Sequence, residues 1–310
     1  MTPPLLVIAG PTGVGKTAAA VALARRLPLE VVSADSRQVY RGMDAATGKP
    51  TPEERRAVRH HLVDVVDPDD RYDAARFRRE AILALEEIRA RGRLPVVVGG
   101  TGLYIRALLR GLDPAPPADA EFRRELAGIA ASRGREALHA RLSAEAPEMA
   151  RRLHPHDHVR VMRALEVVRA GTGRERRRWQ APVLEHDVVH VGLTRDRAAL
   201  ARALRNRAAA MAAAGLLEEV RALLGRGYEP SLPALQGIGY RQFVLVARGQ
   251  LTEPDAVRLM ARDTVRYARR QWTWFLREPD VQWIDVDAAG SADGVARVIE
   301  ERARQGGIIE

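Results

Sequence analysis

The sequence predicts an α/β fold, with a parallel β-sheet core that an all-helical insertion domain interrupts. Short, nearly continuous apolar runs alternate with longer helical patterns through the first hundred residues, which is typical of parallel strands joined by helical crossovers. A proline-rich segment, DPAPPAD at 113–119, then opens a stretch with no strand pattern, and a further strand-like run follows at 187–193. The length of 310 residues also exceeds that of a typical single domain.

The expected strands are apolar runs rich in β-branched residues, as strands buried on both faces require. They are 5–9, 31–34, 62–66, 95–98 and 187–193. Helices are expected between and after them, at 17–26, 74–90, 195–226, 239–249, 253–277 and 292–304. Residues 120–170 are rich in alanine and arginine and are expected to be helical. We therefore expect a core domain formed by 1–113 with 186–310 and an insertion domain at 114–185, whose end is marked by RERRR at 174–178 and by Pro182.

Composition excludes several classes of protein. With 46% hydrophobic and 29% charged residues, the chain can bury a core and is not globally disordered. It has no apolar run of membrane-spanning length and no basic leader before residues 5–9. The absence of cysteine excludes disulfides and thiolate zinc sites. We expect a cytoplasmic protein with no membrane span.

The charge is strongly basic, with 50 Lys and Arg against 40 Asp and Glu, a net +10. Only Lys16 and Lys49 are lysines, and arginine suits the two-pronged recognition of phosphate. The excess favours a nucleic-acid partner, with codon usage and surface solubility as the alternative explanation. The helix expected at 253–277 has arginines three and four residues apart that should form one basic face. They are Arg258, Arg262, Arg266, Arg269 and Arg270.

A phosphate site is predicted at residues 10–17, GPTGVGKT, which match GxxxxGK[ST]. The motif follows a strand and opens a helix, the context of a P-loop, so the core should be P-loop NTPase-like. Backbone N–H groups of the loop would bind phosphate, Lys16 would reach terminal oxygens, and Thr17 would place its hydroxyl on Mg²⁺. The predicted site is Gly10, Pro11, Thr12, Gly13, Val14, Gly15, Lys16 and Thr17.

Two further segments end at the same edge of the sheet. Asp35 follows the strand 31–34, and Thr101 follows the strand 95–98. Ligands of open α/β sheets bind beyond the carboxyl ends of strands, so both side chains should face the phosphate site. A carboxylate beside a diphosphate is repelled, so Asp35 would either help to hold Mg²⁺ or act on a second substrate. The alternatives are helix-capping roles for both residues.

Three histidines stand at 154, 156 and 158, ahead of a predicted helix. Their only nearby carboxylate is Asp157, and the spacing favours Asp157 as the cap of a helix at 158–169 over a metal site.

Six motifs, in order, resemble those of bacterial tRNA dimethylallyltransferases (tRNA isopentenyltransferases). They are GPTGVGKT at 10–17, SADSRQVYRGMDAATGKP at 33–50, GGTGLY at 99–104, HPHDHVRVMRALEV at 154–167, QGIGYRQ at 236–242 and TVRYARRQWTWF at 264–275. The resemblance implies transfer of a dimethylallyl group from dimethylallyl diphosphate to N6 of adenosine 37 in tRNAs that read codons beginning with U, with Mg²⁺ as cofactor. The P-loop would hold the diphosphate, and the base would flip into a channel.

The resemblance also implies roles for single residues. Asp35 would be the general base, with Lys16 and Thr101 as further catalytic residues, and the partner would be the tRNA anticodon stem-loop, bound by a monomer. The implied tRNA contacts are Asp35, Ser36, Arg37, Gln38, Thr101, Arg123, Val159, Arg160, Val161, Met162, Arg163, Gln236, Gly237, Ile238, Gly239, Tyr240 and Arg241.

The chain departs from the family pattern at three positions. Val159 replaces a common Gln, His156 replaces an Asn, and Ala203 replaces an Arg. Arg202 or Arg207 is a candidate to replace that missing arginine.

Other functions also fit a P-loop. One is a kinase that uses ATP and a small acceptor, a second is prenylation of free AMP, and a third is a nucleic-acid-binding NTPase switch. The arginine excess, the helical insertion and the six ordered motifs favour the tRNA prenyltransferase.

Overall fold

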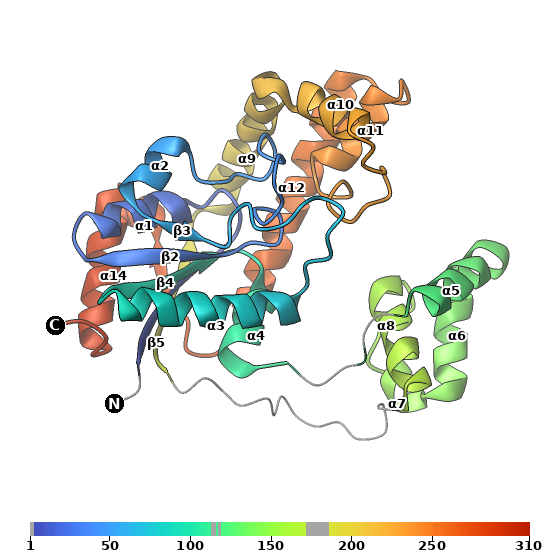
Figure 1. Cartoon of the computed structure of the whole chain (residues 1–310), viewed down its shortest axis with the longest axis horizontal. Coiled ribbons are helices and arrows are strands. Elements are labelled where there is room, and N and C mark those ends of the chain that lie inside the picture. The colour runs from blue at the N-terminus through green and yellow to red at the C-terminus, as the bar shows by residue number, and fades with distance from the viewer. Residues whose placement is uncertain (1–2, 113–115, 117–118, 172–185) are drawn as a thin grey trace. The chain divides into compact units, whose positions relative to one another are not determined.

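The computed structural model describes residues 3–112, 116, 119–171 and 186–310 (Figure 1). The chain divides into two units, which are treated separately below: Met1–Leu109 with Leu184–Glu310, and Arg110–Val183. The predicted boundary markers at 174–178 and Pro182, and most of the 113–119 segment, lie outside the described residues.

The first unit contains a six-stranded sheet in which all strands are parallel, in the order β3-β2-β4-β1-β5-β6. The strands are β1 (Pro4–Ala9), β2 (Leu29–Ala34), β3 (His60–His61), β4 (Leu94–Gly99), β5 (Asp187–Thr194) and β6 (Gln282–Asp285). This confirms the predicted α/β fold and four of the five predicted strands. The short strand β6 was not predicted.

The strand predicted at 62–66 is wrong. The strand in this region is β3, just before it, and Leu62 and Asp64 have φ values of 60° and 59°. A left-handed backbone cannot continue a strand. The apolar character of the segment has another cause, since Val66 is fully buried and pairs with Tyr40 in an isolated bridge.

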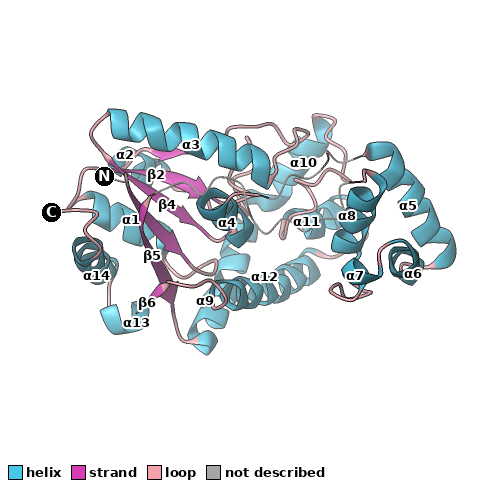
Figure 2. Cartoon of the chain, turned by 90° about the horizontal axis from the view of Figure 1, so that it is seen from below, coloured by secondary structure: helices cyan, strands magenta, loops and turns pink. Residues whose placement is uncertain are grey.

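The sheet is covered by helices on both faces, as a parallel sheet requires (Figure 2). Alternate residues of β1 enter different cores: Leu5 and Val7 join one, and Leu6 and Ile8 join the other. Helices α3 (Ala74–Ala90) and α4 (Gly102–Arg110) pack in the first core, and α1 (Lys16–Ala24) and α14 (Ala292–Gln305) pack in the second. The predicted helix at 74–90 is confirmed with the same bounds.

Strand register places the functional loops side by side. Gly99, the last residue of β4, is level with Ala9 of β1 and with Ala34 of β2. The segments that follow these three strands therefore leave the sheet at one point, and they begin with Gly10, Asp35 and Gly100.

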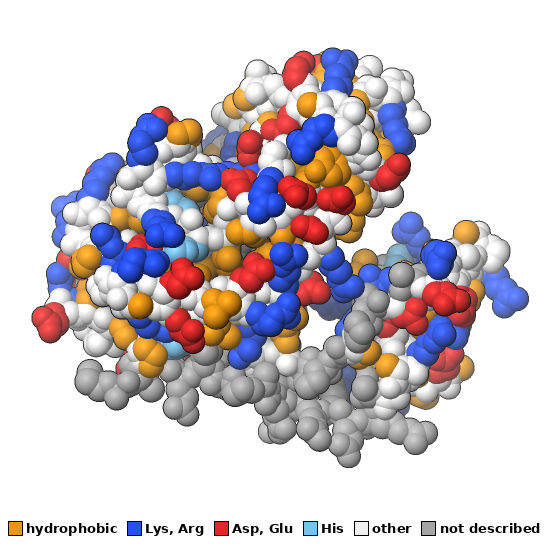
Figure 3. Space-filling view, in the orientation of Figure 1, with side chains coloured by type: hydrophobic (Ala, Val, Ile, Leu, Met, Phe, Trp, Pro, Cys, Tyr) orange, Lys and Arg blue, Asp and Glu red, His pale blue; other side chains and the backbone are white. Residues whose placement is uncertain are grey.

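Four further helices of this unit lie between β5 and β6 in the chain. They are α9 (Arg197–Met211), α10 (Leu217–Gly225), α11 (Tyr240–Ala247) and α12 (Glu253–Phe275), with the short α2 (Pro52–Ala57) and α13 (Val286–Ala289) elsewhere. The helix predicted at 195–226 is interrupted by a π-helical turn at Ala212–Leu216, where Gly215 has φ 96°. Over this unit in Figure 3, basic and acidic side chains are interspersed.

All the secondary-structure elements described in the second unit are helices, as predicted. It contains α5 (Ala120–Arg133), α6 (Glu136–Glu145), α7 (Pro147–Ala150) and α8 (His158–Arg169) around its own core of Phe122, Leu126, Leu138, Leu142 and Leu165. The predicted cap is confirmed, because the Asp157 side chain accepts a hydrogen bond from the Arg160 N–H. No helix in the described parts of either unit has the length and hydropathy to cross a bilayer.

Candidate active site

The P-loop lies between β1 and α1, where the sequence predicts it. Its curl requires glycine at position 13, where φ is +76° and a Cβ atom would lie 2.6 Å from Cδ2 of Leu204. The Lys16 ammonium donates to the carbonyl oxygens of Gly10 (3.0 Å) and Pro11 (2.9 Å). The loop is thus closed on its own lysine and packed against α9.

The charge of Lys16 is unusually easy to remove. Burial lowers the pKa of its ammonium from 10.5 to about 8, Asp35 raises it, and Arg207 lowers it further. The lysine therefore titrates near neutral pH, and a bound polyanion would favour its charged form.

A cavity of about 370 Å³ opens in front of the P-loop. Backbone and side chains from three loops and from α9 line it, and we call it the phosphate cavity. Its lining includes Gly13, Gly15, Lys16, Thr17, Ser33, Asp35, Gln38, Lys49, Glu54, His60 and Arg207. Glycine, ammonium, hydroxyl and guanidinium groups together suit a diphosphate.

A second cavity, of about 290 Å³, adjoins it and is more aromatic and aliphatic; we call it the acceptor cavity. Its lining includes Ser36, Arg37, Ala46, Ala208, Met211, Gln236, Ile238, Arg241, Met260, Thr264, Tyr267 and Arg270. The two cavities share five lining residues: Thr12, Asp35, Thr47, Leu204 and Arg207. A reaction between a ligand in one cavity and a ligand in the other would take place at these five residues.

Asp35 is the only carboxylate among the shared residues. Its Oδ1 accepts a hydrogen bond from the Arg37 N–H at 2.8 Å, and its Oδ2 has no hydrogen bond among the described residues. A turn, not a helix, follows it, so the helix-capping alternative for Asp35 is wrong. One oxygen is fixed by the backbone and the other is free to accept a proton.

Arg207 is the guanidinium that the structure brings to this junction. Burial lowers its pKa, and the nearby carboxylates of Asp35 and Glu54 raise it. Arg202, the other candidate to replace the missing family arginine, is exposed and lines neither cavity. The sequence left both open, and burial at the junction favours Arg207.

Thr101 lies behind the acceptor cavity and does not line it. Its hydroxyl oxygen accepts from the Ser36 N–H at 3.0 Å and hydrogen-bonds with Tyr267. Burial and the charge of Asp35 raise the pKa of Tyr267 to about 12, so this tyrosine is neutral and can donate at physiological pH. Thr101 therefore orders two residues that do line the cavity, Ser36 and Tyr267.

The buried side chain of Gln271, which sequence reasoning missed, connects the loops. Its Oε1 accepts from the Thr12 N–H at 2.9 Å, and its Nε2 donates to the Gly100 carbonyl at 2.8 Å. A Cβ atom at Gly100 would collide with this amide, which explains glycine there. Helix α12 thus aligns the P-loop with the loop after β4. The family motif around 264–275 marks the position, although no property of the sequence alone shows the contact.

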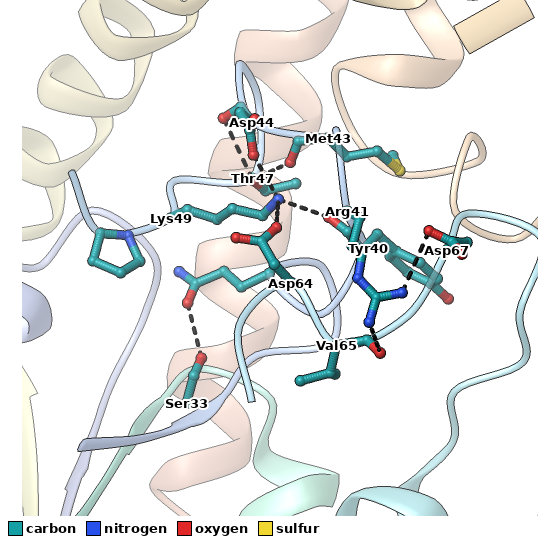
Figure 4. Close-up of polar contacts among 12 residues, drawn as sticks. Ser33, Tyr40, Arg41, Met43, Asp44, Thr47, Lys49, Asp64, Val65 and Asp67 are labelled. Carbon is teal, nitrogen blue, oxygen red and sulfur yellow. Dashed lines mark hydrogen bonds and ion pairs between the residues drawn. The ribbon is translucent and has the colours of Figure 1, made fainter. Parts of the chain in front are cut away.

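The segment 36–50 lines both cavities and is held by a buried lysine (Figure 4). Lys49, whose side chain is 4% exposed, donates to the Tyr40 carbonyl (2.6 Å) and to the carboxylates of Asp44 (2.6 Å) and Asp64 (2.5 Å). Gln38 accepts from Ser33 Oγ and donates to the Gly48 carbonyl, both at 2.8 Å. This network orders the outer rim of the phosphate cavity.

The predicted tRNA contacts of the core differ in which cavity they line. Ser36, Arg37, Gln236, Ile238 and Arg241 line the acceptor cavity, together with Asp35, while Gln38 lines the phosphate cavity. Gly237 and Gly239 line neither cavity.

The tRNA contact at Tyr240 stays a prediction, and the structure shows Tyr240 1% exposed, with its hydroxyl donating to Glu219 at 2.6 Å. Glu219 in turn accepts from the N–H groups of Asp44 and Ala45, so Tyr240 supports the segment 36–50 from behind.

The predicted contacts of the insertion unit also differ in exposure. Val159 is 81% exposed and Arg160 is exposed, while Met162 is half-buried. Val161 is fully buried in the helical core, and the tRNA contact there stays a prediction.

Arg123 and Arg163 of this unit share one buried partner, Glu166, at 2.7 and 3.0 Å. Burial opposes the charge of Glu166, but the hydrogen bonds from the two arginines hold its pKa below the usual value. Both arginines therefore have a structural role.

No group of three His, Cys, Asp or Glu in the described residues could hold a metal, including the histidines at 154, 156 and 158. The phosphate cavity does present the oxygen donors that Mg²⁺ prefers, in Thr17 and Asp35. Two protein oxygens suffice for an ion that keeps its waters and binds substrate phosphate.

Comparison with known proteins agrees with this geometry. The model of a family described as IPP transferase matches residues 38–278. The chain is 46% identical over 288 residues to tRNA dimethylallyltransferase 2 of Geotalea uraniireducens, covering 91% of this chain and 92% of the relative. It is 49% identical over 299 residues to the tRNA dimethylallyltransferase of Anaeromyxobacter sp. strain Fw109-5, covering 96% and 98%.

Solved structures show the same fold. The full-length tRNA isopentenylpyrophosphate transferase of Bacillus halodurans aligns with a TM-score of 0.72 at 37% identity, covering 98% of each chain. A eukaryotic dimethylallyltransferase acting on tRNA aligns with a TM-score of 0.70 at 26% identity, covering 92% of this chain and 74% of that one. On these matches, the chain belongs to the IPP transferase family.

Proposed function

We propose that this protein transfers a dimethylallyl group from dimethylallyl diphosphate to N6 of an adenosine in the anticodon loop of tRNA, at position 37. One observation carries the proposal: Asp35 lies where a phosphate-binding cavity meets a second cavity. The names of the relatives support the choice of substrates. We also propose that the reaction takes place in the cytoplasm.

The phosphate cavity would bind the prenyl diphosphate. Departure of diphosphate from an allylic carbon leaves negative charge on the bridging oxygen, and fixed cations stabilise that transition state. Lys16, Arg207 and the P-loop amides supply positive charge and hydrogen bonds there.

The acceptor cavity would receive the flipped adenine. The lone pair of the exocyclic amine is delocalised into the ring, and the nitrogen must lose a proton as the new C–N bond forms. A carboxylate within hydrogen-bond reach accepts that proton and accelerates the step by about 10²–10⁴-fold. The free Oδ2 of Asp35 is suited to this role. Flipping a base from a loop costs a few kcal/mol, which contacts with Tyr267 and Ile238 would offset.

Mg²⁺ fits the donor set of the phosphate cavity, with the Thr17 hydroxyl as the protein group that would hold it beside substrate phosphate and water. When bound, the ion would neutralise diphosphate charge. In the insertion unit, the exposed Val159 and Arg160 would contact the tRNA.

The test supplies radiolabelled dimethylallyl diphosphate and an anticodon stem-loop to the full chain. We expect label in the RNA, and we expect Asp35→Asn to lower turnover by about 10²–10⁴-fold while prenyl diphosphate binding persists. Asp69→Asn is the matched control, because Asp69 is exposed on a neighbouring loop and lines neither cavity.

Wild-type turnover by Asp35→Asn would remove the general-base role. Label in free AMP but not in RNA would identify AMP as the prenyl acceptor. Phosphoryl transfer from ATP would identify a kinase. Either result would contradict the proposed tRNA substrate.

A further inference from the structure

A groove runs along the seam between α9 and α12, outside the two cavities of the active site. The seam is closed by Leu200, Leu204, Val265 and Ala268. Two hollows, of about 480 and 430 Å³, lie along it and adjoin at Val265 and Arg269. We call them together the α9–α12 groove. Among the described residues, Leu204 is the only one that lines a hollow of this groove and also the acceptor or phosphate cavity.

The larger hollow is lined by arginines and aliphatic side chains alone. Arg205 comes from α9, and four arginines come from α12: Arg258, Arg262, Arg266 and Arg269. All five are exposed, and no carboxylate lines either hollow. This contrasts with the interspersed charges on the face of the unit in Figure 3.

Three of these guanidinium groups have no acidic partner. Arg258 pairs with Asp255 and Arg262 with Asp263, but Arg205, Arg266 and Arg269 form no ion pair with any described residue. Like charges gathered at one place repel one another and destabilise the folded state. A polyanionic ligand would reverse that effect, since it would pair with all three.

The length of the row identifies the class of anion. Arg258 and Arg269 are eleven residues apart on one helix, a rise of about 16 Å at 1.5 Å per residue. A nucleic-acid strand carries one phosphate per about 3.4 Å of helix axis, so the row matches roughly five consecutive phosphates. A single phosphate or diphosphate group spans only a fraction of it. In the second hollow Arg195 is paired with Asp287, and Arg197, whose guanidinium lies over the Trp272 ring, extends the positive charge of the row.

We propose that the α9–α12 groove binds the phosphate backbone of the tRNA substrate at a site separate from the reacting adenosine. The proposal rests on the proposed function for the identity of the RNA. Arg270, which sequence spacing placed on the same basic face, lines the acceptor cavity instead. Arg270 is twelve residues from Arg258, or about three and one third turns, so the two side chains leave the helix in directions about a third of a turn apart. The groove and the catalytic cavity therefore use different faces of α12.

The test variant is Arg205→Gln/Arg266→Gln/Arg269→Gln, which removes three charges and leaves no acid unpaired. Its matched control is Arg79→Gln/Arg297→Gln/Arg302→Gln, three exposed arginines on α3 and α14 that line none of these cavities. The Kd for full-length tRNA is measured between 50 and 300 mM salt, with thermal melts to confirm folding. Turnover at saturating tRNA and KM for dimethylallyl diphosphate are measured on the same proteins.

We expect the groove variant to bind tRNA at least tenfold more weakly at about 100 mM salt, and its slope of log Kd against log salt to be smaller by about two. Turnover at saturating tRNA and KM for the diphosphate should stay within about twofold of wild type. A Kd and a slope equal to those of the control triple would overturn the proposal. That result is expected if the groove binds an acidic protein and not tRNA. Loss of turnover with unchanged Kd would also overturn it. If the wild type transfers no prenyl group to tRNA but still shows the salt effect, the proposed function fails and the RNA groove stands.

Discussion

At the scale of single residues, the site depends on charges whose environment changes their behaviour. Lys16 is a cation held beside a second cation, Arg207, and close to the carboxylate of Asp35. Burial makes the lysine easier to deprotonate than a lysine in water, because the charged form loses hydration. Loss of the Lys16 proton therefore removes one of the positive charges that line the phosphate cavity.

The pKa of Lys16 leads to a prediction for the pH dependence of the reaction. The folded pKa, about 8, lies below the ordinary 10.5, so the free enzyme loses this charge as pH rises through about 8. We expect kcat/KM for dimethylallyl diphosphate to fall above that pH, because kcat/KM reports the free enzyme.

The control is Lys16→Arg, whose guanidinium keeps its proton. This variant should be less active, since an arginine does not fit the closed loop, but its profile should lack the decline near pH 8. An identical decline in wild type and Lys16→Arg would show that another group titrates.

At the scale of elements, the helices that follow β5 align the loops of the sheet. Helix α12 joins the P-loop to the loop after β4 through Gln271. Helix α9 packs Leu204 on Gly13 and brings Arg207 to the junction of the cavities. The π-helical turn at Ala212–Leu216 separates α9 from α10 and lets each pack independently.

The conformation of Gly215 in that turn leads to a prediction for stability. Its φ of +96° is unfavourable for any residue with a Cβ atom, although no neighbour lies closer than 3.7 Å to such an atom. We expect Gly215→Ala to lower the free energy of unfolding by about 1–2 kcal/mol through backbone strain alone.

Gly225→Ala is the control in a urea titration, because Gly225 ends α10 with an ordinary helical φ and has open space around it. This substitution should leave stability unchanged or raise it by about 0.5–1 kcal/mol. Equal effects of the two substitutions would mean that the backbone conformation at position 215 imposes no strain on alanine.

At the scale of the whole molecule, the chain consists of two units with separate cores. The insertion unit buries Phe122, Leu126 and Leu165 among its own helices, and Glu166 is the buried ion-pair centre that joins Arg123 and Arg163. Each unit should therefore respond by itself to changes in its core.

Glu166→Gln should destabilise the insertion unit and leave the sheet unit unchanged. Removing the carboxylate takes away the acidic partner of both arginines, and their partial exposure limits the loss to about 1–3 kcal/mol. Hydrogen exchange by mass spectrometry should show faster exchange in α5 and α8 and no change in β1 and β4.

Lowering the pH should destabilise the insertion unit of the wild type in the same way as Glu166→Gln. The folded pKa of Glu166 is depressed, so its contribution is present above the ordinary pKa of about 4.5 and is lost as pH falls through the lower folded value. Exchange that increases equally in both units on Glu166→Gln would contradict independent cores.

The α/β class, four of the strands, the helical insertion and the phosphate loop could be predicted from the amino-acid sequence. These features depend on local patterns: apolar runs, helical spacing, a P-loop that follows a strand, and a capping aspartate before α8. The same patterns placed Asp35 at the sheet edge, since parallel strands end together. The strand expected at 62–66 failed because an apolar run shows burial but not the left-handed backbone of Leu62 and Asp64.

Which side chains meet becomes evident only in the folded molecule. Gln271 and Arg207 are far from the P-loop in sequence, and no local pattern shows that they reach it. Tyr240 and Val161 lie in motifs that suggested a tRNA-binding surface, yet packing against neighbouring helices buries them. The same packing separates Arg270 from the other arginines of α12 and joins Arg205 to them. Contacts between distant segments depend on how helices dock on the sheet, which is set by the complementary shapes of their surfaces and not by the residues of any one segment.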